Sequence, residues 1–165
     1  MTCLSRLAMV LLLAASAAAA QDSENNRQSL KGLKGVYVLV EPLEAEVERD
    51  GLNQTSIQTD VELRLRQAGI TVLTEAERLA APGTPFLYVL VNAKSGSPYA
   101  FSIDVELCQN VRLDRDPNMQ ISGATTWSVT AVGTVGRENL RNIRDFIKDD
   151  VDKFVNAYLS VNPKK

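Results

Sequence analysis

The chain has 165 residues, 45% of them hydrophobic and 23% charged, a composition that fits a folded globular protein and excludes a disordered or membrane-embedded one. The formal net charge is −2, and no run of basic residues is longer than the terminal Lys164 and Lys165. Because phosphate binding needs a basic surface, we do not expect nucleic acid as a partner. The sequence has no histidine, which excludes Ser-His-Asp, Cys-His and histidine–metal chemistry, and we expect no cofactor.

Residues 1–20 have the order of parts found in a secretory signal peptide. Arg6 gives a weakly basic start, an apolar run follows, and small residues end at Ala20. The apolar run of about 14 residues is shorter than the roughly 20 needed to cross a bilayer. We therefore expect cleavage after Ala20, no stable membrane insertion of the mature chain, and a periplasmic or secreted product, with the alanine-rich leader favouring a bacterial envelope.

Cleavage would leave Cys108 as the one thiol of the mature chain, because the other cysteine, Cys3, lies in the leader. An internal disulfide is then impossible. The thiol either lies buried in the domain or pairs with a second chain, and the oligomeric state stays open.

The mature chain divides into a polar lead-in over residues 21–33, predicted to be disordered, a single α/β domain over 34–161, and a tail over 162–165. The first element of the domain is the apolar run 36–40, which predicts a strand covered on both faces and closed by Glu41 and Pro42. An acidic connection over 44–51 follows.

A helix is predicted next, beginning at Asn53 or Thr55 and ending at Gly69. Its expected buried stripe has four members: Ile57, Val61, Leu65 and Ala68. A short strand over 70–73 and a buried strand over 86–91 follow, and the first strand, the helix and the later strand make a parallel crossover.

The most regular alternation in the chain lies between residues 101 and 113, where apolar and polar residues take turns. It predicts a long strand with one dry and one wet face. Residues 114–119 form a turn, and 121–135 return as a second long strand, so the two strands should form an antiparallel hairpin. Trp127 is expected on the dry face near Leu107, in the core rather than at a binding surface.

The last predicted element is an amphipathic helix from about residue 138 to 159, with its apolar side chains at three- and four-residue steps: Leu140, Ile143, Ile147, Val151, Phe154 and Tyr158. Strands with one dry face and helices with one dry stripe favour an α+β fold, an α/β two-layer sandwich. We expect a mixed sheet of about five strands with two main helices on one face, and the other face open.

The wet face of the first long strand is the candidate interaction face, and it has six members: Ser102, Asp104, Glu106, Cys108, Asn110 and Arg112. Asp104 and Glu106 stand about 7 Å apart by strand rise, a spacing that a glycosidase pair could use. Acidic side chains are also common on any exposed strand face, and this second interpretation is favoured.

Residues 114–118 copy the first ligand positions of a calcium loop, but Met119 replaces the required glycine and Thr125 the bidentate glutamate. A hairpin turn rich in Asp, Pro and Asn explains the segment without a metal.

The order of elements over residues 34–160 resembles the N-terminal domain of the TolB family of the Tol-Pal system and the envelope-assembly domains of the curli-secretion lipoprotein type. The local similarity is the phrase LRLRQAGITV at residues 63–72. The resemblance implies a non-enzymatic domain that acts through protein contacts, and it carries over no functional residue. We expect neither the propeller of the first group nor the lipid anchor of the second, so a shared partner does not follow from the resemblance.

We therefore expect an exported, non-catalytic module of the cell envelope that binds or assembles with another protein through its open sheet face or edge. Two alternatives remain: a small hydrolase using Asp104 and Glu106, and a small-ligand carrier, which would need an apolar cavity between sheet and helices.

Overall fold

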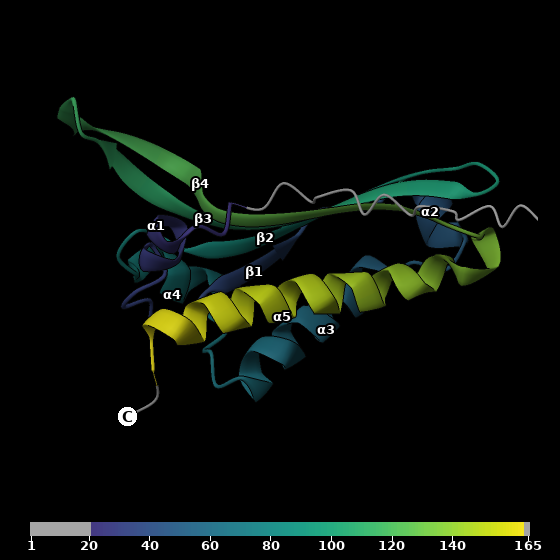
Figure 1. Ribbon diagram of the computed structural model, residues 1–165, viewed down its shortest axis with the longest axis horizontal. Coiled ribbons are helices and arrows are strands. Elements are labelled where there is room, and N and C mark those ends of the chain that lie inside the picture. The colour runs from purple at the N-terminus through teal and green to yellow at the C-terminus, as the bar shows by residue number, and fades with distance from the viewer. Residues whose placement is uncertain (1–20, 164–165) are drawn as a thin grey trace, which may run out of the picture.

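The computed structural model describes residues 21–163. The predicted signal peptide, residues 1–20, and the last two residues of the predicted tail lie outside this part. The chain has an α+β fold with one mixed sheet of four strands in the order β1-β2-β3-β4 (Figure 1). The strands are β1 (Tyr37–Val40), β2 (Phe86–Lys94), β3 (Tyr99–Leu113) and β4 (Asp116–Val135).

The sheet contains both the predicted parallel pair and the predicted hairpin. β1 runs parallel to β2, while β3 pairs antiparallel with β2 and with β4. The helices are α1 (Glu24–Gln28), α2 (Ala45–Arg49), α3 (Gln54–Gln67), α4 (Glu75–Ala80) and α5 (Ile143–Val161), and a 3-10 turn η1 (Arg137–Asn142) precedes the last of them.

The expected count of five strands is wrong by one. Residues 70–73 form only an isolated bridge, in which Val36 pairs with Val72. Gly35 allows this close approach, because a Cβ there would lie 2.6 Å from the carbonyl oxygen of Thr71. The segment does not continue as a strand since Thr74 already caps α4 in a capping box with Glu77.

The two long helices lie along the same side of the sheet (Figure 1). The predicted stripe of α3 is confirmed for its three buried members Ile57, Val61 and Leu65, and Asn53 caps the helix through a bond to the Ser56 amide. The apolar stripe of α5 is also buried, and Phe154 meets Trp127 edge-on with 5.4 Å between ring centroids. Trp127 pairs with Leu107 in the core, as predicted.

The polar lead-in is ordered, so the prediction of disorder for residues 21–33 is wrong. Gln21 bridges to Ser128, α1 follows, and Leu30 is fully buried. The indole Nε1 of Trp127 donates to an Asp22 carboxylate oxygen at 2.7 Å. The polar side chains of the lead-in bond to the domain instead of to water, and periodicity alone does not show this.

Asp22 is also held by Arg27, whose guanidinium makes two bonds to the carboxylate and lowers its pKa. The chain end is tied down in a similar way. Asn162 accepts a bond from the Gly32 amide and donates to the Leu30 carbonyl, so the predicted tail begins one residue later than expected. The two ends of the described chain therefore contact each other at the same end of the molecule.

The acidic connection also differs from the prediction, because residues 45–49 form α2 and bury Val47. At the other end of the chain, the predicted helix from residue 138 begins as η1 and becomes α-helical at Ile143. None of the helices in residues 21–163 is long and apolar enough to span a membrane.

The packing of the lead-in predicts that Leu30→Ala lowers the free energy of unfolding by about 2–5 kcal/mol, because it removes a fully buried side chain. Leu79→Ala is the matched control: Leu79 is 61% exposed on α4, and its change should stay within about 0.5 kcal/mol. Denaturant unfolding followed by Trp127 fluorescence measures both. Equal stability of the two variants would contradict the ordered lead-in.

Candidate functional site

The strands of the sheet differ greatly in length, and this mismatch creates two uncovered regions. The last pair between β2 and β3 joins Phe86 to Cys108, so β3 continues beyond it paired only with β4. At the opposite end, the last pair between β1 and β2 joins Val40 to Val89, while β2 continues to Lys94. The first mismatch produces a projecting hairpin, and the second leaves a strand edge without a neighbour.

The six predicted face residues are divided between these regions. Ser102 lies beside the uncovered edge of β2. Asn110 and Arg112 lie at the other end of β3, past Cys108, where β2 no longer pairs with it. Asp104 lies between them on a three-stranded part of the sheet, and Glu106 and Cys108 lie where β1 makes the sheet four-stranded. The structure therefore places them along one strand rather than around one cavity.

Each of the two carboxylates of the predicted pair is bonded by a threonine of β4. Thr130 Oγ1 donates to Asp104 at 2.6 Å, and Thr125 Oγ1 donates to Glu106 at 2.9 Å. The groove beside the strand is lined by Ser102 but by neither carboxylate. A glycosidase pair must flank a bound substrate. The geometry therefore gives the hydrolase alternative no supporting feature.

Cys108 is buried, with 5% of its surface exposed. Its sulfur lies 3.9 Å from Thr125 Oγ1 and 4.0 Å from a Glu106 carboxylate oxygen. Burial raises the pKa of the thiol; the Thr125 hydroxyl opposes this, and the negative charge of Glu106 adds a smaller upward effect. Because the thiolate is the reactive form, this site disfavours disulfide formation with a second chain.

The projecting hairpin, which we call the arm, comprises residues 111–122. It leaves the body of the molecule at the upper left of Figure 1. Its turn is shorter than the predicted 114–119, because β3 ends at Leu113 and β4 already begins at Asp116. The Asn118 amide donates to Asp116 Oδ1, and Arg112 donates to the Pro117 carbonyl. No group of metal-binding side chains occurs in residues 21–163, here or elsewhere.

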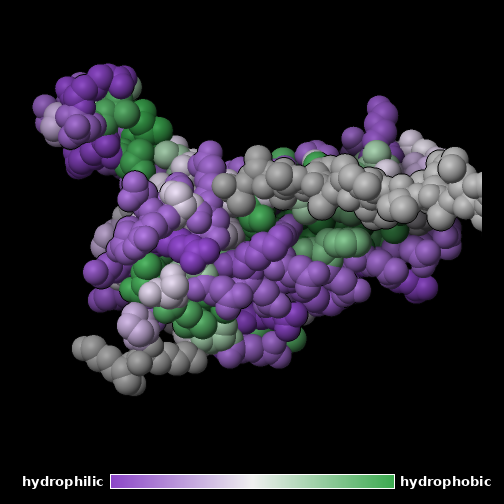
Figure 2. Space-filling model, viewed as in Figure 1, coloured by the Kyte–Doolittle hydropathy of each residue, from purple (hydrophilic) through white to green (hydrophobic). Residues whose placement is uncertain are grey.

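One side of the arm is apolar and uncovered. Val111 pairs with Ile121, so alternation places four residues together: Val111, Leu113, Met119 and Ile121. Val111, Leu113 and Ile121 are partly exposed, and Met119 is 47% exposed. Figure 2 shows green along the arm below a purple tip. The apolar face predicted for residues 101–113 is therefore buried only as far as Leu107.

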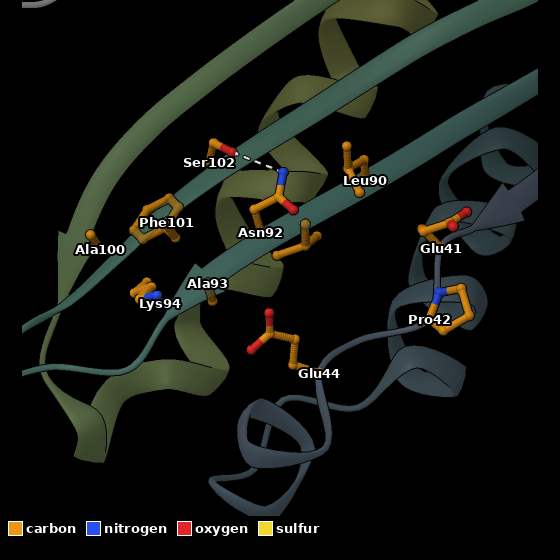
Figure 3. A pocket seen from close by; sticks show the side chains of 11 residues that line it. Glu41, Pro42, Glu44, Leu90, Asn92, Ala93, Lys94, Ala100, Phe101 and Ser102 are labelled. Atoms are coloured by element: carbon orange, nitrogen blue, oxygen red, sulfur yellow. Dashed lines mark hydrogen bonds between the residues drawn. The ribbon is translucent and has the colours of Figure 1, made fainter.

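A groove of about 450 Å³ lies at the opposite end, beside the uncovered edge of β2 (Figure 3). Leu90 to Lys94 form its floor together with residues 100–102 of β3, and Glu41, Pro42 and Glu44 form the facing wall. In Figure 3 the Glu44 side chain points into the space between the wall and β2. The groove exists because the chain turns away from β2 at Pro42.

An apolar hollow of about 370 Å³ lies at the periphery, between the segment before β1 and the end of α4. Leu33, Leu73 and Pro85 contribute to its lining. The space between the sheet and the long helices is instead filled by large buried side chains such as Trp127 and Phe154. The cavity that the ligand-carrier alternative requires was expected there, and the hollow is in a different place.

One buried carboxylate was not singled out from the sequence. Asp150 of α5 is 1% exposed, and Lys153 donates to one of its oxygens at 2.7 Å. Burial raises the pKa of Asp150, against the opposing effect of Lys153. Asp150 belongs to neither the groove nor the arm. In the sequence it is marked only as a charged residue on the apolar side of the last predicted helix.

Models of known protein families do not match this sequence, and neither do curated proteins. The resemblance to the TolB type of envelope domain is therefore an expectation about function and not a family assignment.

The burial of Cys108 predicts slow reaction with a thiol reagent in the native state. In a Cys3→Ser chain, which leaves one thiol, Ellman's reagent should label Cys108 only at the rate at which the protein opens. Labelling should become complete at once in denaturant. Fast labelling of the native protein, or a dimer lost on reduction in light scattering, would show that the thiol is accessible.

Proposed function

We propose that this protein is an exported, non-catalytic module of the cell envelope that binds or assembles with a partner protein through the apolar side of its arm. The observation that carries the proposal is the uncovered stripe of Val111, Leu113, Met119 and Ile121. An isolated two-stranded hairpin is marginally stable in water, and an exposed apolar patch on it marks a contact site.

The charges of the arm support a protein partner over a membrane or nucleic acid. Two arginines and two aspartates stand at residues 112–116, so the arm has no net charge. Anionic lipid surfaces and phosphate backbones both select basic segments. An apolar centre with a mixed charged rim is the usual composition of a protein interface.

Export and envelope location rest on the features of residues 1–20 described from the sequence. The absence of histidine and the threonine bonds of Asp104 and Glu106 favour a binding role over hydrolysis. The peripheral apolar hollow is the one feature that favours a ligand carrier, and it lies apart from both the arm and the groove.

The test places a photoreactive amino acid at Met119 or at Gln120 in the full chain, expressed in its source cells. Met119 lies on the apolar side of the arm, and Gln120, opposite Arg112, lies on the other. We expect a crosslinked product from position 119 and none from 120, on a chain recovered from the envelope fraction with Gln21 as its first residue. Mass spectrometry identifies the partner.

The two positions are adjacent in the arm and both exposed, so a non-specific encounter labels both. Equal crosslinking from 119 and 120, or none from 119, would contradict an interface on the apolar side. A product that contains two copies of this chain would also contradict the proposal of a foreign partner.

A further inference from the structure

The groove beside β2 is the place where a strand of the sheet is missing. β1 pairs with β2 only as far as Val89, because the chain leaves the sheet after Glu41 and turns toward α2. On its other side, β2 stays paired with β3 from Leu90 to Lys94. Residues 90–94 are therefore an edge next to a strand that stops early.

The backbone groups on this edge can be identified from the pairing of β1. The carbonyls of Pro85 and Val89 accept bonds from the Tyr37 and Glu41 amides. In a strand, the amide and carbonyl of every second residue point to the same edge, so those of Val91 and Ala93 point into the groove. No backbone group in residues 21–163 bonds to them from that side.

The lining of the groove shows that it faces the edge and not one face of the sheet. Side chains from both faces contribute: Leu90 and Asn92 from the open face, and Val91 and Ala93 from the helix face. A segment placed in this space would lie in the plane of the sheet. A volume of about 450 Å³ between β2 and the wall gives room for one extended chain segment.

The facing wall is acidic. Glu41 and Glu44 line the groove, and Glu46 and Glu48 follow on α2, with no basic residue between positions 41 and 48. The carboxylates of Glu44, Glu46 and Glu48 belong to exposed residues, and none of them takes part in an ion pair found in residues 21–163. A ligand that lies along this wall is favoured if it carries positive charge.

From these observations we infer that the groove binds an extended, basic segment of a partner protein as an additional strand beside residues 90–94 of β2, with a lysine or arginine next to Glu44. This inference rests on the proposed function, because it gives the partner a second point of attachment. The arm and the groove are at opposite ends of β3, so the partner engages the sheet at both of its ends.

The probe is a short fluorescein-labelled peptide of alternating lysine and valine, added to the full chain and followed by fluorescence anisotropy. Ala93→Pro removes one edge amide, and edge positions tolerate proline. We expect it to abolish binding, while Ala93→Ser, which keeps the amide, preserves it. Native Trp127 fluorescence verifies that both variants are folded.

A second pair of variants tests the charge. Glu44→Lys should weaken binding by about tenfold or more, since like charges then meet in the groove. Glu48→Lys makes the same change on α2, outside the lining, and should have a smaller effect. Equal weakening by the two substitutions would contradict a contact at Glu44, because binding would then depend only on the net charge of the protein.

Peptide affinity unchanged by Ala93→Pro, or no affinity at all, overturns the inference. So does a dimer of the unmodified chain that Ala93→Pro dissociates, because the edge would then serve a second copy. Crosslinking from Met119 is measured separately, and its persistence in the Ala93→Pro chain distinguishes failure of the groove from failure of the proposed function.

Discussion

The four paired strands have unequal lengths, and the cover of the sheet follows from this inequality. β1 has 4 residues and β2 has 9, while β3 and β4 have 15 and 20. A sheet can be covered by helices only where it is wide enough to support them, and here α3 packs against β1 while α5 packs against β3 and β4. At one end, the long hairpin extends past the helices and forms the arm. At the other end, β1 stops before β2 does, and the groove lies beside the unpaired part of β2.

The ends of the described chain contribute to the stability of the covered part. Asp22 bonds to the indole of Trp127, Leu30 fills a fully buried position, and Asn162 bonds back to residues of the lead-in. A salt bridge between Asp60 of α3 and Arg144 of α5 joins the two long helices at 2.8 Å and lowers the pKa of Asp60. These contacts concentrate on the helix side of the sheet, and none of them reaches the arm.

Elements with a strong period were predictable from the sequence, and those defined by tertiary contacts were not. The stripe of α3, the long hairpin and the core position of Trp127 follow from spacing, and Asn53 and Gly69 mark the helix ends. Residues 21–33 were predicted to be disordered but are structured. The sequence does not show this because their stabilising hydrogen bonds go to Trp127 and Thr126, about a hundred residues away. The arm and groove were missed because alternation shows which side chains share a face, but not which neighbours cover it. The one available signal was the difference in predicted strand length. The strands at 36–40 and 86–91 are much shorter than the strand at 101–113, so part of the long strand must lack a neighbour on that side.

The arm is a part of the hairpin without helix cover, whereas residues 103–107 of β3 carry buried core side chains. Hydrogen exchange of the purified full chain, resolved along β3 and β4, tests it most directly. The account predicts that amides at 111–121 exchange at least about a hundredfold faster than those at 103–107, because local opening of an uncovered hairpin costs far less than opening of the core. Equal protection along the whole hairpin would contradict it, since the arm would then be covered in the isolated protein.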